Sequence, residues 1–449
     1  MSARTRARPL RWKALTAGLS ASVLLLAACG GDDEDPPADA GDDPADEDAD
    51  EGDGDSGDDG VTIRFSWWGS DSRHEQTQEI IAAFEEANPG ITVEPDFTDW
   101  GSYWDRLATA TAGSDAPDVM TQEERYMTDY ALRGQLLDLN ELDVDLSNID
   151  PLALGGGQID GAQYAVATGV NAFTPVVDPQ AFEDAGVDMP DDTAWTWDDV
   201  IALCDEIASN SDYNGIQVDG SNEAGFKIFA RQRGQELYNP DGSLGFDAQT
   251  LADFWQIQLD LVNADCTPAA SELQEIEGPD TSLVATNQAA MTTAYWTNQL
   301  GALSGTAGRT LELLRYPGEG EQTGMYLKPA MFYSISSQTE HPEAAAAFVD
   351  FLLNDPAAAE IMLTDRGLPA NLEIREHILP MLPEDQTQVA DFMAEIGPDL
   401  ADPPPPPPNG AGEIPDIMTR LWEEVIFEQM TPIEAAEQFI TEAEAATSG

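Results

Sequence analysis

Apolar and polar residues alternate at positions 61–65 (VTIRF), which is the two-residue period of a β-strand. Positions 75–88 instead place Ile80, Ile81 and Phe84 on one face, which is the spacing of an amphipathic helix. The two periods continue to alternate, with a strand expected at 91–96, a helix at 102–111 and a strand at 117–120. This order of strand, helix, strand, helix, strand predicts an α/β unit that binds its ligand at the carboxyl ends of the strands.

The rest of the chain is dominated by helical periods. Helices are expected at residues 196–209, 250–264, 341–353, 356–364 and 413–430. Six consecutive prolines at 403–408 predict a stiff, extended segment on the surface. About 390 residues follow residue 60, which is more than one ordinary core contains, so we expect two lobes.

The N-terminus has the pattern of an export signal. Basic residues precede a short apolar stretch, roughly residues 14–28, which is too short to cross a bilayer as a helix. The sequence LAAC at 26–29 resembles the bacterial lipobox, which implies a signal peptide at 1–28 and a lipidated Cys29. An ordinary signal peptide with an incidental cysteine is the alternative. Residues 30–60 are only Gly, Asp, Glu, Pro, Ala and Ser, so 29–60 is expected to be a disordered acidic linker.

The chain is strongly acidic, with 85 Asp and Glu against 19 Lys and Arg and a formal net charge of −66. A field of this sign excludes nucleic acid and anionic lipid head groups as partners. It favours solubility in salt, because counterions must screen the self-repulsion, and it suggests a saline or alkaline habitat. Beyond the signal, Lys227 and Lys328 are the only lysines.

Motifs of common enzyme chemistry are missing from the sequence, which has no P-loop, GxSxG, GxGxxG or HExxH pattern. The three histidines are not spaced as a metal-binding set. We therefore expect no catalytic residue, no metal and no cofactor. Cys204 and Cys266 fall in expected helices; they form either a disulfide, which an exported compartment permits, or two buried thiols.

A series of short motifs resembles extracellular solute-binding proteins of family 1, the substrate-binding lipoproteins of carbohydrate ABC importers, which include the maltose-binding proteins. The motifs occur in the family's order over nearly all of residues 61–449. They are FSWWG at 65–69, FEEANPGITV at 84–93, APDV at 116–119, GAQYAV at 161–166, AGV at 185–187, WTWD at 195–198, QAAM at 288–291, HPEAA at 341–345 and RGLPAN at 366–371.

The resemblance implies two α/β lobes joined by chain crossings, with the ligand enclosed between them when the lobes hinge shut. By similarity, the chain crosses near Val170, near Met325 and after Asn371. The N-lobe would comprise residues 61–169 and 325–371, and the C-lobe residues 170–324 and 372–449.

Sugar hydroxyls need hydrogen-bonding partners, and sugar C–H faces pack against aromatic rings. Candidates from the residues are tryptophans and polar side chains that follow predicted strands. These are Trp67, Trp68, Asp71, Arg73, Trp100 and Glu123. The resemblance adds Asn171 at the first crossing, Trp296 as the aromatic that stacks on a sugar ring, and Phe332 and Arg366. Where the family often has Gly before this tryptophan, the chain has Tyr295. The spacing of Trp104, Trp197, Trp255 and Trp422 favours core packing, and Trp195 is also expected to be structural.

The sequence thus predicts a lipid-anchored, monomeric receptor on the extracellular face of the cell membrane. It would capture a mono- or oligosaccharide and deliver it to the permease subunits of an ABC importer. It would contact the membrane only through its lipid and would break no bond. Two alternatives are a binding protein for a peptide or polyamine and a secreted glycoside hydrolase.

Overall fold

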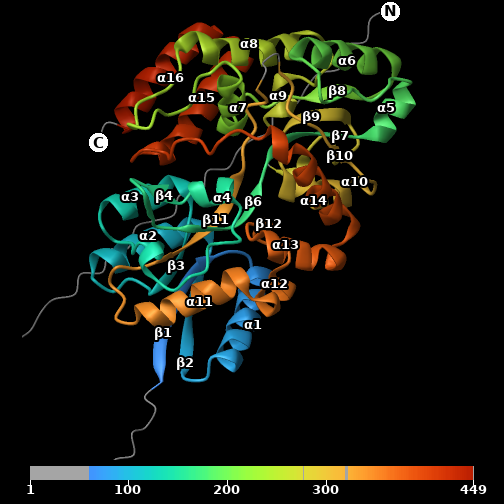
Figure 1. Ribbon diagram of the computed structural model, residues 1–449. Coiled ribbons are helices and arrows are strands. Elements are labelled where there is room, and N and C mark those ends of the chain that lie inside the picture. The colour runs from blue at the N-terminus through green and yellow to red at the C-terminus, as the bar shows by residue number, and fades with distance from the viewer. Residues whose placement is uncertain (1–59, 277, 319–321, 448–449) are drawn as a thin grey trace, which may run out of the picture. The chain divides into compact units, whose positions relative to one another are not determined.

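The computed structural model describes residues 60–447 apart from 277 and 319–321 (Figure 1). Residues 57–449 form one compact unit with its own core. The predicted signal peptide, Cys29 and most of the acidic linker lie outside the described residues. No helix in the described part is both long and apolar enough to cross a membrane.

The first of two main sheets has six strands in the order β12-β6-β11-β3-β1-β2. β1 runs parallel to β2 and β3, whereas β11 is antiparallel to both β3 and β6. The strands are β1 (Val61–Trp68), β2 (Ile91–Thr98), β3 (Val119–Gln122), β6 (Val166–Asn171), β11 (Lys328–Ile335) and β12 (Leu368–Pro369). Helices of this part are α1 (Asp71–Ala87), α2 (Trp100–Ala112), α3 (Glu124–Leu132), α4 (Pro151–Gly155), α11 (Pro342–Asn354) and α12 (Pro356–Met362).

Burial explains the order of this sheet. Every residue of β3 and β6 is buried, as expected for strands covered on both faces. β2, at the edge, buries only Val93. α11 and α12 pack beside α1 on one face of the sheet (Figure 1).

The second sheet has four strands in the order β10-β7-β9-β8. β9 runs antiparallel to β7 and parallel to β8. The strands are β7 (Phe173–Val177), β8 (Asn214–Gln217), β9 (Ala289–Trp296) and β10 (Glu312–Leu313). The helices are α5 (Pro179–Ala185), α6 (Trp197–Asn210), α7 (Glu223–Arg231), α8 (Ala248–Asn263), α9 (Ala270–Leu273), α10 (Leu300–Ala307), α14 (Glu384–Ile396), α15 (Ile414–Ile426) and α16 (Pro432–Thr447). α13 (Leu372–Ile378) packs instead against α12 and β12 of the first part.

The described residues also form smaller elements, namely a two-stranded sheet and six 3₁₀ helices. They are β4 (Gln158–Ile159), β5 (Ala162–Gln163), η1 (Leu139–Glu141), η2 (Pro279–Thr281), η3 (Thr297–Gln299), η4 (Leu379–Met381), η5 (Gly397–Asp399) and η6 (Ala411–Glu413). The chain passes between the main sheets from β6 to β7 through Ala172 alone, and again between β10 and β11.

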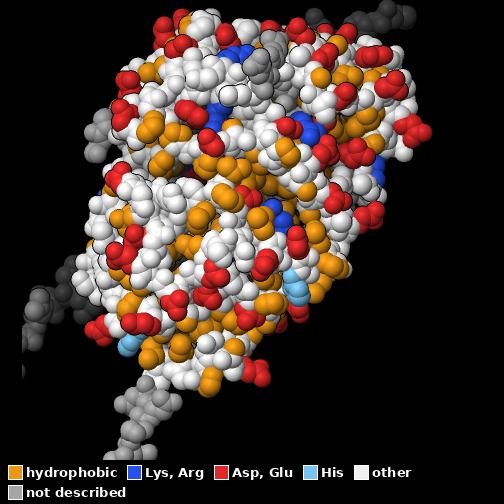
Figure 2. Space-filling view, viewed as in Figure 1, with side chains coloured by type: hydrophobic (Ala, Val, Ile, Leu, Met, Phe, Trp, Pro, Cys, Tyr) orange, Lys and Arg blue, Asp and Glu red, His pale blue; other side chains and the backbone are white. Residues whose placement is uncertain are grey.

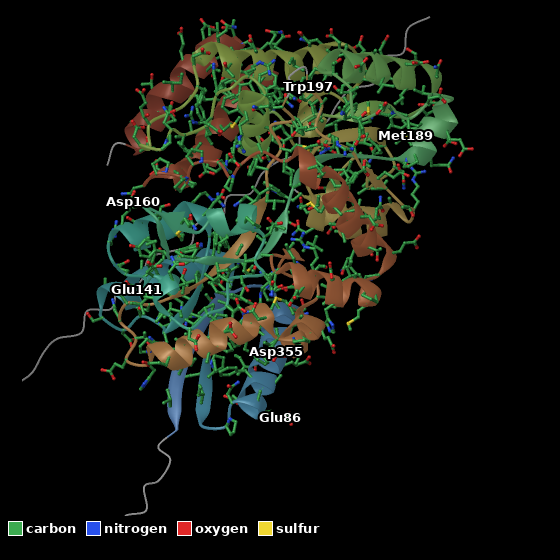
Figure 3. The ribbon with its side chains drawn as sticks, viewed as in Figure 1. Glu86, Glu141, Asp160, Met189, Trp197 and Asp355 are labelled. Carbon is green, nitrogen blue, oxygen red and sulfur yellow. A yellow bond between two sulfur atoms is a disulfide. The ribbon has the colours of Figure 1, made fainter. Side chains whose placement is uncertain are left out.

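The α/β class expected from the sequence is confirmed, and helix positions agree to within a few residues. α6 begins at Trp197 (Figure 3), after a capping box in which Thr196 and Asp199 exchange hydrogen bonds. A disulfide joins Cys204 on α6 to Cys266. The prediction that Cys266 lies in a helix is wrong, because α8 ends at Asn263.

Candidate functional site

A cavity of about 540 Å³ lies where β8 and β9 end. We call it the Trp296 cavity. Its lining joins the ends of both strands to the segment after α9 and to one face of α15. The lining residues are Gln217, Val218, Asp219, Ser221, Asn222, Leu273, Gln274, Ile276, Gly278, Pro279, Tyr295, Trp296, Gln299, Thr419 and Trp422.

The end of β8 is fixed by an internal network of hydrogen bonds. The side-chain oxygen of Gln217 accepts from the backbone N–H of Leu283 at 2.8 Å and from Ser282 Oγ at 3.1 Å. Further along, Asn222 caps α7, its side chain accepting from the N–H of Ala224 at 2.9 Å. Gln217 and Asn222 are therefore fixed, and they hold the segment between them, which carries Asp219 and Ser221, in place.

Aromatic faces form the apolar part of the cavity. Trp296 ends β9, is half-buried, and has its ring edge-on to Phe173 at 5.0 Å between centroids. The indole of Trp422 packs on Gly220, where an added Cβ would lie 2.6 Å from the nearest ring atom. The carbonyl of Gly220 accepts from Trp255 Nε1 at 2.8 Å. A glycine thus lets an indole lie flat against the backbone beside the cavity.

Asp219 is the acidic group of the described lining. One of its carboxylate oxygens, Oδ1, accepts from both the backbone N–H and the hydroxyl of Ser221. The pKa of Asp219 is raised above its ordinary value, because burial outweighs the hydrogen bonds from Ser221, which lower it. A carboxylate in this position is a strong acceptor for a ligand that brings hydrogen-bond donors.

A second cavity, of about 380 Å³, lies beside the first crossing, and we call it the crossing cavity. Asn171 of β6 lines it, and its Oδ1 accepts from Thr297 Oγ1 at 3.5 Å. Because Trp296 lines one cavity and the next residue, Thr297, lines the other, both cavities adjoin the end of β9. The crossing cavity is lined by Asn171, Thr297, Asn298, Gly301, Ala302, Thr364, Asp365, Leu368, Asp385, Gln386 and Val389.

Four aromatic side chains gather at the carboxyl end of β1 and the start of α2. Trp68 packs edge-on against Trp100, with 5.0 Å between ring centroids, and Trp104 stacks on Tyr126 at 3.9 Å. Trp100, expected to follow a strand, is the first residue of α2, and it is 39% exposed. Tyr126 Oη is 4.0 Å from where a Cβ at Gly412 would lie, just before α15. Tyr126 of this cluster therefore lies near the segment leading into the helix of Trp422, and its helix α3 packs against η6 of that segment.

Glu123 lies in a buried ion network at the start of α3. Lys328 Nζ is 3.2 Å from Glu123 Oε1 and 2.9 Å from Glu124 Oε1, and Arg125 Nε is 3.0 Å from Glu123 Oε2. Burial raises the pKa of Glu123, but Lys328 and Arg125 outweigh this and hold it below its usual range. Lys227 on α7 adds a longer contact to Glu124, at 4.0 Å.

The other predicted contacts are spread over the first sheet and its helices. Arg73 Nε donates to Asp365 Oδ2 at 2.7 Å, next to the crossing cavity, and Asp71 is exposed at the start of α1. Trp67 is fully buried, its Nε1 donating to His74 Nδ1 at 3.1 Å. Phe332 is also buried.

Arg366 is buried as well, and its guanidinium donates to Tyr333 Oη and Thr77 Oγ1. The structure therefore brings Asn171 and Trp296 to neighbouring cavities. It places Trp67, Phe332 and Arg366 in the core, and we leave these three out of the site proposed below.

Sequence reasoning missed Asp219, Asn222 and Gln299, and it favoured core packing over a site role for Trp422. Trp422 follows Met418 and precedes Val425 at helical spacing, so it was expected in the core. It is indeed almost buried, yet one side lines the cavity. Asp219 gave no signal among 85 acidic residues. In the described part of the chain, no group of three or more His, Cys, Asp or Glu side chains is arranged to hold a metal.

Comparison with known proteins places this geometry in a family. Residues 70–359 match the family model of bacterial extracellular solute-binding proteins. The diacetylchitobiose binding protein DasA of Streptomyces coelicolor is 26% identical over 227 residues, 50% of this chain and 49% of that protein. The chain thus matches about half the length of that relative.

Two further matches cover more of the chain. An uncharacterized lipoprotein of Streptomyces antibioticus is 23% identical over 70% of this chain and 71% of its own length. The solved structure of an extracellular solute-binding protein family 1 member from Alicyclobacillus acidocaldarius is 28% identical, with a TM-score of 0.74, over 87% of this chain and 99% of that one. The chain belongs to the family of bacterial extracellular solute-binding proteins.

Proposed function

We propose that this protein is a lipid-anchored extracellular receptor that captures a mono- or oligosaccharide in the Trp296 cavity and delivers it to an ABC importer. The observation that carries the proposal is the lining of that cavity. Trp296 and Trp422 supply aromatic surface, and amide, hydroxyl and carboxylate groups lie around them. Sugars need this combination, because their C–H faces pack on rings while their hydroxyls require directional partners.

The relatives support the sugar class and the anchor. One is named for binding diacetylchitobiose, and another is called a lipoprotein. The chain has its own lipobox-like sequence ending in Cys29, and we propose that this cysteine carries the lipid. Delivery to permease subunits follows from the family's role, and we propose a monomer that binds its ligand without breaking a bond.

Closure of two lobes is the proposed means of capture. We assign residues 61–169 and 325–371 to one lobe and residues 170–324 and 372–449 to the other. A boundary near this first crossing is supported because β6 and β7 belong to different sheets and are separated by Ala172 alone, although β6 of the first sheet runs on to Asn171. The helix after Asn371, α13, packs against α12 and β12, so the second lobe would begin its separate packing after this helix. We propose that the crossing between β6 and β7 and the one between β10 and β11 form the hinge about which the lobes rotate.

The cluster of Trp68, Trp100, Trp104 and Tyr126 is the proposed aromatic contribution of the first lobe. Trp100 has the most exposed ring of the predicted tryptophan contacts on that side. Because Tyr126 approaches Gly412, the cluster adjoins the start of α15, whose later residues line the Trp296 cavity. Trp100 is thus positioned to add a second stacking surface for a longer oligosaccharide.

A screen of thermal stability tests the proposal. Residues 57–449 would be heated with mono-, di- and trisaccharides in high salt, alongside spermidine and short peptides. A ligand at 100 times its Kd adds about 2.7 kcal/mol of stability, which is readily seen as a higher Tm. We expect a saccharide to raise Tm, and Trp296→Ala to abolish the rise.

Phe427→Ala is the matched control, because Phe427 is an exposed aromatic residue at the end of α15 and is not among the residues that line the cavity. It should leave the saccharide response intact. A response to spermidine or a peptide but to no saccharide would contradict the proposal. Asp219 makes a cationic solute the second candidate, because a carboxylate in the cavity also suits an amine.

A further inference from the structure

We propose that the Trp296 cavity selects saccharides that carry no carboxylate and that Asp219 determines this selectivity. The inference rests on the proposed function, since it assumes that a saccharide binds in this cavity. It goes further by dividing saccharides into two chemical classes, neutral or amino sugars on one side and uronates on the other.

The described lining of the Trp296 cavity carries a negative charge and no positive one. Its polar side chains are the amides of Gln217, Asn222, Gln274 and Gln299, the hydroxyls of Ser221, Tyr295 and Thr419, the indole N–H groups, and the carboxylate of Asp219. None of the described residues that line it is Lys, Arg or His. The structure does not describe residues 277 and 319–321, which are three glutamates and a glycine, so none of them is a base.

The cations nearest in sequence are paired elsewhere. Arg420, beside Thr419 on α15, forms an ion pair with Glu442 of α16. Lys227, on the helix that Asn222 caps, lies over the ring of Tyr326 and toward Glu124. No described base is therefore positioned in the cavity to neutralise a bound carboxylate.

The described lining of the neighbouring crossing cavity is also acidic and contains no base. Asp365 and Asp385 line it, and no described residue of its lining is a base. Arg73 approaches it, but its guanidinium is bonded to Asp365 through both the carboxylate and the backbone carbonyl. An oligosaccharide that extended from one cavity to the other would meet carboxylates in both.

The position of Asp219 explains why this charge would favour a neutral sugar over a uronate. Ser221 holds Oδ1, whereas Oδ2 accepts no hydrogen bond from any described residue. A sugar hydroxyl can donate to Oδ2 and satisfy it. A uronate carboxylate has no proton to donate and brings a like charge, which in a partly buried site costs far more than the lost bond.

Calorimetric titration of residues 57–449 tests the inference with matched ligands. The probes are the neutral saccharide that gives the largest thermal shift and its C6-carboxylate counterpart, together with digalacturonate. Titrations in 1 M NaCl screen the field of the acidic surface to about 3 Å, so that short-range contacts with Asp219 dominate. We expect the uronates to bind on the order of 100-fold more weakly than the neutral sugar.

The variant Asp219→Asn should raise the ratio of uronate to neutral affinity about tenfold or more, even if both affinities fall. Asp260→Asn removes the same charge from the exposed side of α8 and should leave the ratio unchanged. If Asp219→Asn does not fold, the wild-type ratio still decides the first half of the proposal.

Uronates that bind the wild-type protein as tightly as neutral sugars would overturn the inference while leaving the proposed function intact. An unchanged ratio in a folded Asp219→Asn variant would overturn the role of Asp219. Binding of no saccharide of either class would overturn the proposed function, and this inference with it.

Discussion

Replacing Lys328 with methionine should destabilise the protein by about 3 kcal/mol, because it removes the cation that two buried carboxylates share. Lys328 Nζ lies 3.2 Å from Glu123 and 2.9 Å from Glu124, and the three side chains are 17%, 7% and 11% exposed. Removing one partner of a buried ion pair costs about 3–5 kcal/mol. We expect the lower end of that range, because Glu123 retains Arg125.

The effect should depend on pH in a defined direction. The pKa of Glu123 in the folded protein lies below its usual range, so the ion pair stabilises the fold at any pH above the unfolded value of about 4.3. This contribution is lost as the pH falls through the folded pKa. The difference in stability between wild type and Lys328→Met should therefore be largest near pH 7 and narrow below about pH 4.

Urea unfolding followed by tryptophan fluorescence at several pH values measures this difference. Arg133→Met is the matched control, because Arg133 pairs with Asp129 at the exposed surface of α3, where such pairs contribute about 0.5 kcal/mol or less. Adding Glu124→Gln to Lys328→Met should recover part of the loss. A loss of less than about 1 kcal/mol at pH 7, or a difference that does not change with acidification, would refute the reasoning.

Two further predictions follow from other contacts. Gly220→Ala should lower the free energy of unfolding by about 1–3 kcal/mol and weaken saccharide binding, because the new Cβ clashes with the Trp422 ring. Gly305→Ala on α10, with no neighbour within 4 Å, should be neutral or stabilising, and equal effects of the two variants in urea unfolding would contradict this. Reducing the Cys204–Cys266 disulfide, which spans 62 residues, should lower the unfolding free energy by about 2–4 kcal/mol. An unchanged Tm after reduction verified by thiol alkylation would show that the bridge contributes nothing.

Local patterns predicted the helices and strands well where these elements are amphipathic. The face formed by Ile80, Ile81 and Phe84 is buried in α1 as the spacing requires. Asn171 and Trp296, which line neighbouring cavities, were supplied by the family resemblance. None of the candidates chosen because they follow predicted strands lines either cavity.

The limits of prediction were set by contacts between distant segments. The spacing of Trp422 shows which face of α15 is buried, but it cannot show that Gly220 leaves room for the indole beside a cavity. Arg366 was chosen by resemblance, yet its partners Tyr333 and Thr77 lie on a strand and a helix far away in sequence. Acidic side chains far outnumber basic ones on the face shown in Figure 2 and in the sequence as a whole, so composition alone could not identify Asp219.

The central claim is that a saccharide binds in the Trp296 cavity, and a crystal structure of residues 57–449 with the best saccharide of the thermal screen tests it most directly. The account predicts a sugar ring packed on the indole of Trp296, with hydroxyls donating to Asp219. A saccharide bound elsewhere, with the Trp296 cavity empty, would contradict the account.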